Sequence, residues 1–374
     1  MKKLLFIVNV DKFFISHRLP IAVEAIKQGY EVHVATKITD QLNFLEMNGM
    51  IVHPLNIHRS GIISIASEFL KILFLLYRIT PEVVHLVTIK PVIFGGIATR
   101  LLGSSSVVSA ISGLGFVFID NRFIGKIRKK IVLYLYRIAL NHKNQKIIFQ
   151  NSDDKNVLVS LARVSHEKTV LIPGSGVNLF KYKTSPPPER DFPVVMFASR
   201  FLIDKGIREF VHAAELINSV EHCADFALVG GIDLFNPASI QQDELDEWKR
   251  KGNVEIWEYS SNMEKTLLNA TIVTLPSYRE GYPKILIEAA ACGRAIVTTN
   301  VPGCRDAIES NVTGLLVPVK DAVLLAESIS ILLDNKNKCE KMGINGRKRA
   351  EELFDIRMIV DSHIKIYSDL LKNI

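Results

Sequence analysis

Short apolar runs and amphipathic stretches alternate along the first half of the chain. Runs typical of buried strands are LLFIVNV, VHVAT, VVHLV and VVSAI, and the apolar spacing predicts helices from about Leu19 to Gln28 and from Val92 to Leu102. Strands and helices that alternate with short connections are typical of a parallel sheet covered by helices on both faces. The first half therefore predicts a doubly wound α/β domain.

The alternation stops near Ile172 and then begins again. The interruption, PGSGVNLFKYKTSPPPERDFP, is rich in Pro and Gly and has no periodicity, which is typical of a linker between domains. After it come the strand-like runs VVMFAS, FALVG, VEIWEY, IVTLPS, AIVTT and GLLVP, with a helix predicted from about Arg208 to Ile217. A second doubly wound unit therefore follows the first.

The length of the chain supports this division. It has 374 residues, of which 48% are hydrophobic, enough for two well-filled cores. We assign residues 1–172 to a first domain, 173–192 to the linker and 193–355 to a second domain. The last predicted helix, from about Ile356 to Leu371, has no strand after it. Such a helix can cross back between units, so we assign residues 356–374 to the first domain.

Positive charge is concentrated before the linker. That part has 22 Lys and Arg residues against 11 Asp and Glu, whereas the remainder has 24 against 28. No acid lies between Asp120 and Asp153, and the segment IGKIRKKIVLYLYRIALNHKNQK predicts an amphipathic basic helix suited to anionic lipid headgroups. Its membrane contacts would be Arg128, Lys129 and Lys130; the alternative is a solvated helix face with snorkelling lysines. Nucleic acid is not expected as a partner, because no aromatic-glycine or zinc pattern accompanies the charge.

No segment predicts a membrane anchor. The short apolar run at the amino terminus is followed by Asp11 and Lys12 without a small-residue cleavage site, so we interpret it as a buried strand. The longest apolar stretch, Ile62 to Ile79, contains charged residues and is not expected to span a membrane. The four cysteines show no CxxC spacing, which disfavours a zinc site and fits a reducing cytosol.

Several kinds of chemistry are disfavoured by missing motifs. No GxGxxG follows the first strand of either unit, which disfavours a nicotinamide enzyme. The chain also lacks a P-loop, a GxSxG elbow, an HExxH motif and a DxD pair. Ligands for metal-clamped phosphate chemistry are therefore not visible, and we expect neither a metal nor a cofactor.

One segment of the second half combines several ligand-binding features. The stretch TLPSYREGYPKILIEAAACGRAIVT predicts a strand, a polar loop, a helix and a strand. Pro283 stands where the helix begins, and the backbone N–H groups at a helix start favour an anionic or hydroxyl-rich ligand. The helix is apolar except for Glu288, and a buried carboxylate requires hydrogen-bond partners. The ribose hydroxyls of a nucleotide would supply two.

Two cations follow the first strand of the same unit. Arg200 and Lys205 stand in the phrase SRFLIDKG, at the predicted carboxyl end of that strand. A pair of cations in this position suits a diphosphate group. Alone, the pair is also explained as ordinary surface charge. Together with the segment from Glu280 to Glu288, it favours a nucleotide site.

These motifs together resemble glycosyltransferase family 4, whose members have the GT-B fold. The matching positions are the glutamate pair Glu280 and Glu288, Ala291-Cys292-Gly293, Arg200, Lys205-Gly206, the linker phrase IPGSGVN with Phe180, and GLLV from Gly314. The resemblance implies two doubly wound Rossmann-like α/β domains that face each other across a cleft. It also implies transfer of a sugar with retention of anomeric configuration and without a metal ion.

The resemblance assigns roles to residues of the second domain. Glu280 would be catalytic and would hold the donor sugar together with neighbouring backbone amides, and Glu288 would bind the ribose. The two cations would neutralise the diphosphate as negative charge develops on it. The donor-binding residues implied in this way are Arg200, Lys205, Gly281, Tyr282, Pro283, Leu286, Glu288 and, from a loop of the first domain, Gly113.

Two phrases of the first domain, FFISHRLP and SAISGLGFVF, look like the bacterial envelope-polysaccharide branch of this family. Many relatives carry a His or a Glu near the position of Ser112, and a serine alone is not a strong base at neutral pH. The acceptor proton would then go to the donor phosphate, to His17 or to His85. For His85 the alternative is a purely structural role, as a hydrogen-bonded residue at the edge of the sheet. We take His17 and Ser112 as catalytic candidates beside Glu280. The acceptor-binding candidates are Phe14, Ser16, Arg18 and His85.

Resemblance to this branch also implies the substrates. The donor would be a UDP-sugar, with an N-acetylhexosamine (GalNAc or GlcNAc) among the transferred sugars, and the acceptor a sugar on undecaprenyl diphosphate. The protein would be cytoplasmic and peripheral on the inner face of the cytoplasmic membrane. Two alternatives stay open, namely a nucleotide-sugar 2-epimerase of the same fold and a non-catalytic nucleotide-sugar-binding protein.

Overall fold

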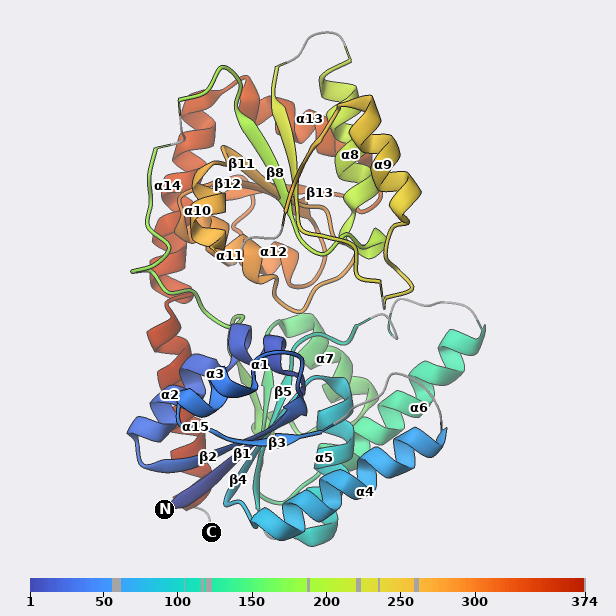
Figure 1. The fold of residues 1–374 in the computed structure, drawn as a ribbon, viewed down its shortest axis with the longest axis vertical. Coiled ribbons are helices and arrows are strands. Elements are labelled where there is room, and N and C mark those ends of the chain that lie inside the picture. The colour runs from blue at the N-terminus through green and yellow to red at the C-terminus, as the bar shows by residue number, and fades with distance from the viewer. Residues whose placement is uncertain are drawn as a thin grey trace. The chain divides into compact units, whose positions relative to one another are not determined.

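The computed structural model describes residues 1–55, 62–103, 105–115, 118, 123–186, 189–219, 223–234, 236–258 and 262–372. The chain forms two compact units, shown in Figure 1. Unit 1 comprises Met1–Ser175 and Ile356–Ile374, and unit 2 comprises Gly176–Asp355. The division at Ser175 falls inside the predicted linker.

Unit 1 is built on a seven-stranded parallel sheet with the order β3-β2-β1-β4-β5-β6-β7. Its strands are β1 Lys2–Val10, β2 Tyr30–Lys37, β3 Ile51–Pro54, β4 Val83–Val87, β5 Ser106–Ile111, β6 Gln145–Phe149 and β7 Thr169–Leu171. Its helices are α1 Asp11–His17, α2 Leu19–Lys27, α3 Leu42–Met47, α4 Ile62–Ile79, α5 Ile89–Leu102, α6 Phe123–Ala139, α7 Ser152–Leu161 and α15 Ile356–Lys372.

Alternation along β1, an inner strand of the sheet, divides the core of unit 1 into two layers. On β1, Leu4, Phe6 and Val8 pack with residues of α2, α3 and α15. Leu5 and Ile7 point to the other face and pack with residues of α4, α5 and α6. The carboxyl-terminal helix therefore packs on the sheet of unit 1, where the topology had led us to expect it.

Unit 2 is built on a six-stranded parallel sheet with the order β10-β9-β8-β11-β12-β13. Its strands are β8 Val194–Ala198, β9 Asp225–Val229, β10 Glu255–Trp257, β11 Ile272–Leu275, β12 Ala295–Thr299 and β13 Gly314–Val317. Its helices are α8 Ile207–Ile217, α9 Gln242–Lys251, α10 Met263–Leu268, α11 Lys284–Ala291, α12 Cys304–Ala307, α13 Ala322–Leu333 and α14 Lys336–Leu353.

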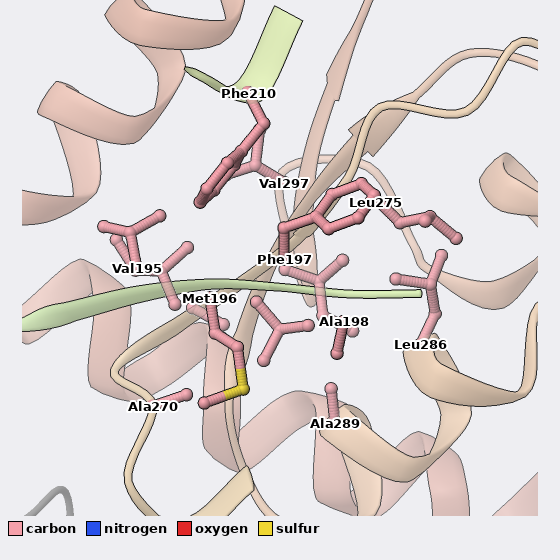
Figure 2. Close-up of a cluster of buried hydrophobic side chains, with 14 of the residues drawn as sticks. Val195, Met196, Phe197, Ala198, Phe210, Ala270, Leu275, Leu286, Ala289 and Val297 are labelled. Carbon is pink, nitrogen blue, oxygen red and sulfur yellow. The ribbon is translucent and has the colours of Figure 1, made fainter. Parts of the chain in front are cut away.

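The central strand of unit 2 is buried on both faces. Figure 2 shows Phe210 of α8 on one side of β8, where its ring lies 5.6 Å from that of Phe197, and Ala289 of α11 on the other side, near Met196. Both sheets are parallel with helices on both faces, so the predicted fold class of two doubly wound α/β units is confirmed.

Two local predictions were wrong. The first helix was expected from about Leu19, but a short helix, α1, already begins at Asp11, whose buried carboxylate accepts hydrogen bonds from the backbone N–H groups of Lys12 and Thr39. The basic helix was expected to continue to Lys146, but α6 ends at Ala139. Lys146 belongs instead to β6, since the residues from Gln145 onward complete the sheet.

Candidate functional site

The candidate site lies at the carboxyl edge of the unit 2 sheet. The strands β8 and β11 are neighbours there, yet the chain continues from β8 to β9 on one side and from β11 to β12 on the other. Ligands of doubly wound folds bind outside the carboxyl ends of the strands at such a switch point. Lys205 follows β8 and Glu280 follows β11, so these two predicted site residues flank it.

Lys205 and Glu280 form an ion pair between Lys205 Nζ and Glu280 Oε1. The Oγ atom of Ser277 lies 2.8 Å from the same carboxylate oxygen. The side chains of Lys205 and Glu280 are only 18% and 12% exposed. Both charges are therefore held in fixed positions, and each keeps a small exposed surface.

Two glycines allow the loops around this pair to pack closely. At Gly206, which has φ +75°, an added Cβ would lie 2.1 Å from the backbone oxygen of Pro276. At Gly303, with φ +80°, it would lie 2.5 Å from the backbone oxygen of Gly281. A side chain at Gly206 would push the loop that carries Lys205 away from the segment after β11, and one at Gly303 would push the loop after β12 away from Gly281.

Glu288 is buried on α11 and is bound by protein groups. Its Oε1 atom accepts a hydrogen bond of 2.8 Å from the Tyr182 hydroxyl and lies 3.3 Å from Lys284 Nζ. Burial raises the pKa of the Tyr182 hydroxyl, and the neighbouring Glu288 carboxylate raises it further. Sequence reasoning predicted that Glu288 needs partners but missed Tyr182, because nothing in the sequence brings the linker to α11.

The other predicted donor contacts differ in accessibility. Arg200 is 57% exposed and donates through Nη1 to Asp233 Oδ2 at 2.8 Å, so each predicted diphosphate cation has its own acidic partner. The Tyr282 hydroxyl donates to the backbone oxygen of Asp306 at 2.8 Å, and its ring is half-buried.

The start of α11 is largely buried. Gly281 and Pro283, the residue that caps α11, have little exposed surface. Leu286 is fully buried in the core of unit 2, as Figure 2 shows, so its side chain has no surface to offer a donor. Its apolar position on the helix serves packing instead.

Among the first-domain candidates, His17 and Ser16 lie at the carboxyl end of α1. The Nδ1 atom of His17 is 2.5 Å from the Ser16 Oγ, and its ring stacks on that of Phe13 at 4.0 Å. Ser16 is exposed and His17 is half-buried. Both side chains therefore have surface that a substrate could contact.

Three other acceptor candidates are core residues of unit 1. Phe14, Arg18 and His85 are 0%, 2% and 0% exposed. His85 lies in the central strand β4, not at a sheet edge, and its Nδ1 atom is 2.5 Å from the Tyr367 hydroxyl. Burial lowers the pKa of His85 well below its usual value, and positive Arg18 lowers it further. Burial therefore removes these three side chains from the set that can contact an acceptor.

Polar atoms without partners gather after the strands at the switch point of unit 1. In the described part of the chain, Asn9 Oδ1, Thr88 Oγ1 and Ser112 Oγ have no hydrogen-bond partner. They stand at the carboxyl ends of β1, β4 and β5, which are adjacent in the sheet. Gly113, with φ +108°, follows Ser112 and allows the sharp turn there.

Thr88 is also strained. It caps α5 with φ 75° and ψ 164°, a region that is costly for a β-branched residue. Sequence reasoning missed both Thr88 and Asn9. The only signal was their position directly after, or at the end of, an apolar strand-like run.

Among the described residues, neither unit shows a membrane-spanning helix or a cluster of metal ligands. No helix there is long and apolar enough to cross a membrane. Within the same residues, no three His, Cys, Asp or Glu side chains are grouped as metal ligands would be.

Two family models match the chain. One, described as "Glycosyl transferase 4-like", matches residues 3–151, and the other, "Glycosyl transferases group 1", matches residues 180–349. The N,N'-diacetylbacillosaminyl-diphospho-undecaprenol alpha-1,3-N-acetylgalactosaminyltransferase of Campylobacter jejuni is 30% identical over 296 residues, 75% of each chain. The capsular polysaccharide biosynthesis glycosyltransferase CapM of Staphylococcus aureus is 26% identical over 358 residues, 92% of each chain.

Solved structures show the same fold. Sucrose-phosphate synthase from Thermosynechococcus elongatus has a TM-score of 0.84 at 20% identity and covers 100% of both chains. HepE of Anabaena, solved in complex with UDP, has a TM-score of 0.79 at 17% identity and covers 99% of this chain and 100% of its own.

Fold and family together define a glycosyltransferase with the GT-B fold. The chain belongs to the group 1 glycosyl transferases, with a glycosyl transferase 4-like first half.

Proposed function

We propose that this enzyme moves an N-acetylhexosamine, GalNAc or GlcNAc, from a UDP-sugar to a sugar carried on undecaprenyl diphosphate. The observation that carries the proposal is the Lys205–Glu280 pair at the switch point of unit 2. Relatives from C. jejuni and Escherichia coli are named for transfer to diphospho-undecaprenol-linked sugars, and HepE was solved with UDP, which supports both substrates. The family assignment favours transfer over the epimerase and non-catalytic alternatives.

The donor site would work by holding charge in place. Lys205 would neutralise the diphosphate as its bond to the sugar breaks, and Glu280 would accept hydrogen bonds from the sugar hydroxyls. Arg200 is exposed, so it can exchange Asp233 for a phosphate oxygen. Glu288, already oriented by Tyr182 and Lys284, would receive the ribose hydroxyls.

In this proposal the acceptor lies against unit 1. The unpartnered atoms suit the hydroxyl groups of a sugar, because Asn9 Oδ1 can accept a hydrogen bond from a hydroxyl and the Thr88 and Ser112 hydroxyls can either donate or accept one. His17 is half-buried and keeps exposed surface at the end of α1, and it would take the acceptor proton, with the donor phosphate as the alternative.

We further propose that the reaction retains anomeric configuration, needs no metal and takes place at the inner face of the cytoplasmic membrane. Cationic side chains would replace the metal in stabilising the diphosphate. On α6, Arg128 and Lys130 are exposed, whereas Lys129 is half-buried with its Nζ atom 5.3 Å from the centre of the Phe118 ring. Membrane attraction would therefore rest more on Arg128 and Lys130 than on Lys129.

The test is release of UDP or GDP from a panel of UDP-sugars and GDP-sugars with a lipid-linked acceptor, in the presence of EDTA. We expect release from a UDP-N-acetylhexosamine that depends on the acceptor. Turnover of a GDP-sugar alone would contradict the donor assignment, and loss of all activity in EDTA would contradict metal independence. A changed sugar without UDP release would support the epimerase.

A further inference from the structure

Three helices of unit 1 form a layer with almost no acidic charge. The helices α4, α5 and α6 pack on the same face of the sheet, and α5 contacts both of the others; Figure 1 shows them on one side of the unit. Their one acidic residue in sequence is Glu68. Its side chain is 2% exposed and pairs with Lys90 at 3.6 Å. The outer charge of this layer is therefore positive.

The outward side of α4 carries an apolar ridge. Leu70, Phe74 and Tyr77 are 61%, 64% and 70% exposed. Their spacing of four and three residues places them on one stripe of the helix. The opposite stripe, which includes Ile72 and Leu76, is buried against the sheet. Sequence patterns did not single out this ridge, because α4 is apolar on nearly all sides.

The helix α6 repeats the arrangement. Its exposed apolar residues are Ile124, Ile127, Ile131 and Tyr134, at 70%, 45%, 54% and 63%. They follow one stripe with spacings of three and four residues. Exposed cations flank both stripes: Lys71 and Arg78 on α4, and Lys126, Arg128, Lys130 and Arg137 on α6.

We propose that these two stripes form one docking face for an anionic lipid bilayer, with Leu70, Phe74 and Tyr77 as the part that enters the headgroup layer. Exposed apolar stripes flanked by charge of one sign match an interface of anionic headgroups over hydrocarbon. The proposal rests on the proposed function, in which the acceptor is lipid-linked. In this arrangement α4 lies along the membrane surface, with its apolar ridge toward the hydrocarbon and its flanking cations among the headgroups.

Flotation of the full chain with vesicles tests the docking face. One set of vesicles contains phosphatidylglycerol mixed with phosphatidylcholine, and the other phosphatidylcholine alone. Wild type should float with the anionic vesicles. In the variant Leu70→Ser/Phe74→Ser/Tyr77→Ser, partitioning into these vesicles should fall at least about tenfold, at low and at high salt alike. The variant Arg128→Ser/Lys130→Ser should lose binding mainly at low salt.

The matched control is Phe44→Ser/Met47→Ser on α3. These residues are 42% and 87% exposed, but α3 packs on the opposite face of the sheet. The control should float like wild type. Failure of wild type to float, or unchanged flotation of the α4 variant, would overturn the proposal. Binding of a second copy of the chain to this face would also overturn it. Light scattering without vesicles would then give the mass of a dimer for wild type and a lower mass for the α4 variant.

A second readout reports insertion directly. In Phe74→Trp, vesicle binding should shift tryptophan emission to the blue relative to the unsubstituted chain, whereas Phe44→Trp should show no such shift. An unshifted Phe74→Trp would contradict insertion. Release of UDP with a water-soluble acceptor analogue should be unchanged in the α4 variant, so that failure of docking and failure of transfer are seen separately.

Discussion

At the scale of single residues, the donor site depends on charges that the protein fixes before any ligand arrives. Both side chains of the Lys205–Glu280 pair are mostly buried, whereas in the Arg200–Asp233 pair the arginine side chain is mostly exposed. Breaking a buried pair leaves an uncompensated charge, and breaking an exposed pair costs little. The two predicted diphosphate cations should therefore differ in their effect on stability.

Lys205→Met should lower the free energy of unfolding by roughly 2–4 kcal/mol, because Glu280 keeps a charge with little solvent around it. Arg200→Gln should lower the free energy of unfolding by less than about 1 kcal/mol, and it should still raise the KM for the donor. Urea unfolding and donor titration of UDP release measure both effects. Equal destabilisation by the two substitutions would contradict the difference in burial.

A substitution at Thr88 should change stability and acceptor binding in opposite directions. Thr88→Gly should raise the free energy of unfolding by about 1 kcal/mol, since glycine adopts φ 75° without strain. If the hydroxyl binds the acceptor, the same change should raise the acceptor KM, while Thr88→Ser restores it. Unchanged KM in Thr88→Gly would show that the unpartnered hydroxyl has no part in acceptor binding.

At the scale of elements, α15 joins the sheet of unit 1 through a buried cluster of bases. His363 on α15 and His85 on β4 stack at 5.6 Å beside Arg18. Burial lowers the pKa of His363 to about 3, with Arg18 as the second cause. Both histidines are therefore neutral in the folded protein.

This cluster predicts acid sensitivity in unit 1. The unfolded histidine gains its proton near its usual pKa of 6.5, whereas folded His363 stays neutral until about pH 3, so stability falls as the pH drops between these values. Between pH 7 and pH 5, His363 alone should account for a loss of about 2 kcal/mol. Urea unfolding of His363→Met should show a smaller loss, and the exposed control His166→Gln the wild-type loss. Identical losses in both variants would contradict this account.

The sequence predicted which segments form strands and helices more reliably than it predicted the residues at which they end. Apolar runs predicted the strands because a parallel sheet buries both faces, as β8 shows. The end of α6 was missed because Lys146 continues a basic pattern, although its neighbours complete β6. In the site, Lys205 was predicted as one of two cations soon after a strand, and Glu280 from the motif that it forms with Glu288. Tyr182 was not, since its contact with Glu288 spans 106 positions.

At the scale of the whole molecule, the two units divide the proposed work. Unit 2 carries the fixed charges that suit a nucleotide diphosphate, and unit 1 carries the unpartnered polar atoms and the basic, apolar helix layer. Most of the excess of positive charge before the linker, read from the sequence, is found on α4, α5 and α6 together. Burial of Arg18 and His85 could not be predicted from a sequence pattern, because the burial of polar residues depends on their tertiary partners.

The most direct measurement is transfer of a radiolabelled sugar from UDP-GalNAc or UDP-GlcNAc to an undecaprenyl-diphosphate-linked glycan, comparing wild type with Glu280→Gln. We expect a labelled, α-linked product from wild type in EDTA, and a rate lower by about 10²–10³ in Glu280→Gln with the fold intact. Wild-type activity in Glu280→Gln, or no labelled product from wild type with either donor, would contradict the proposed function.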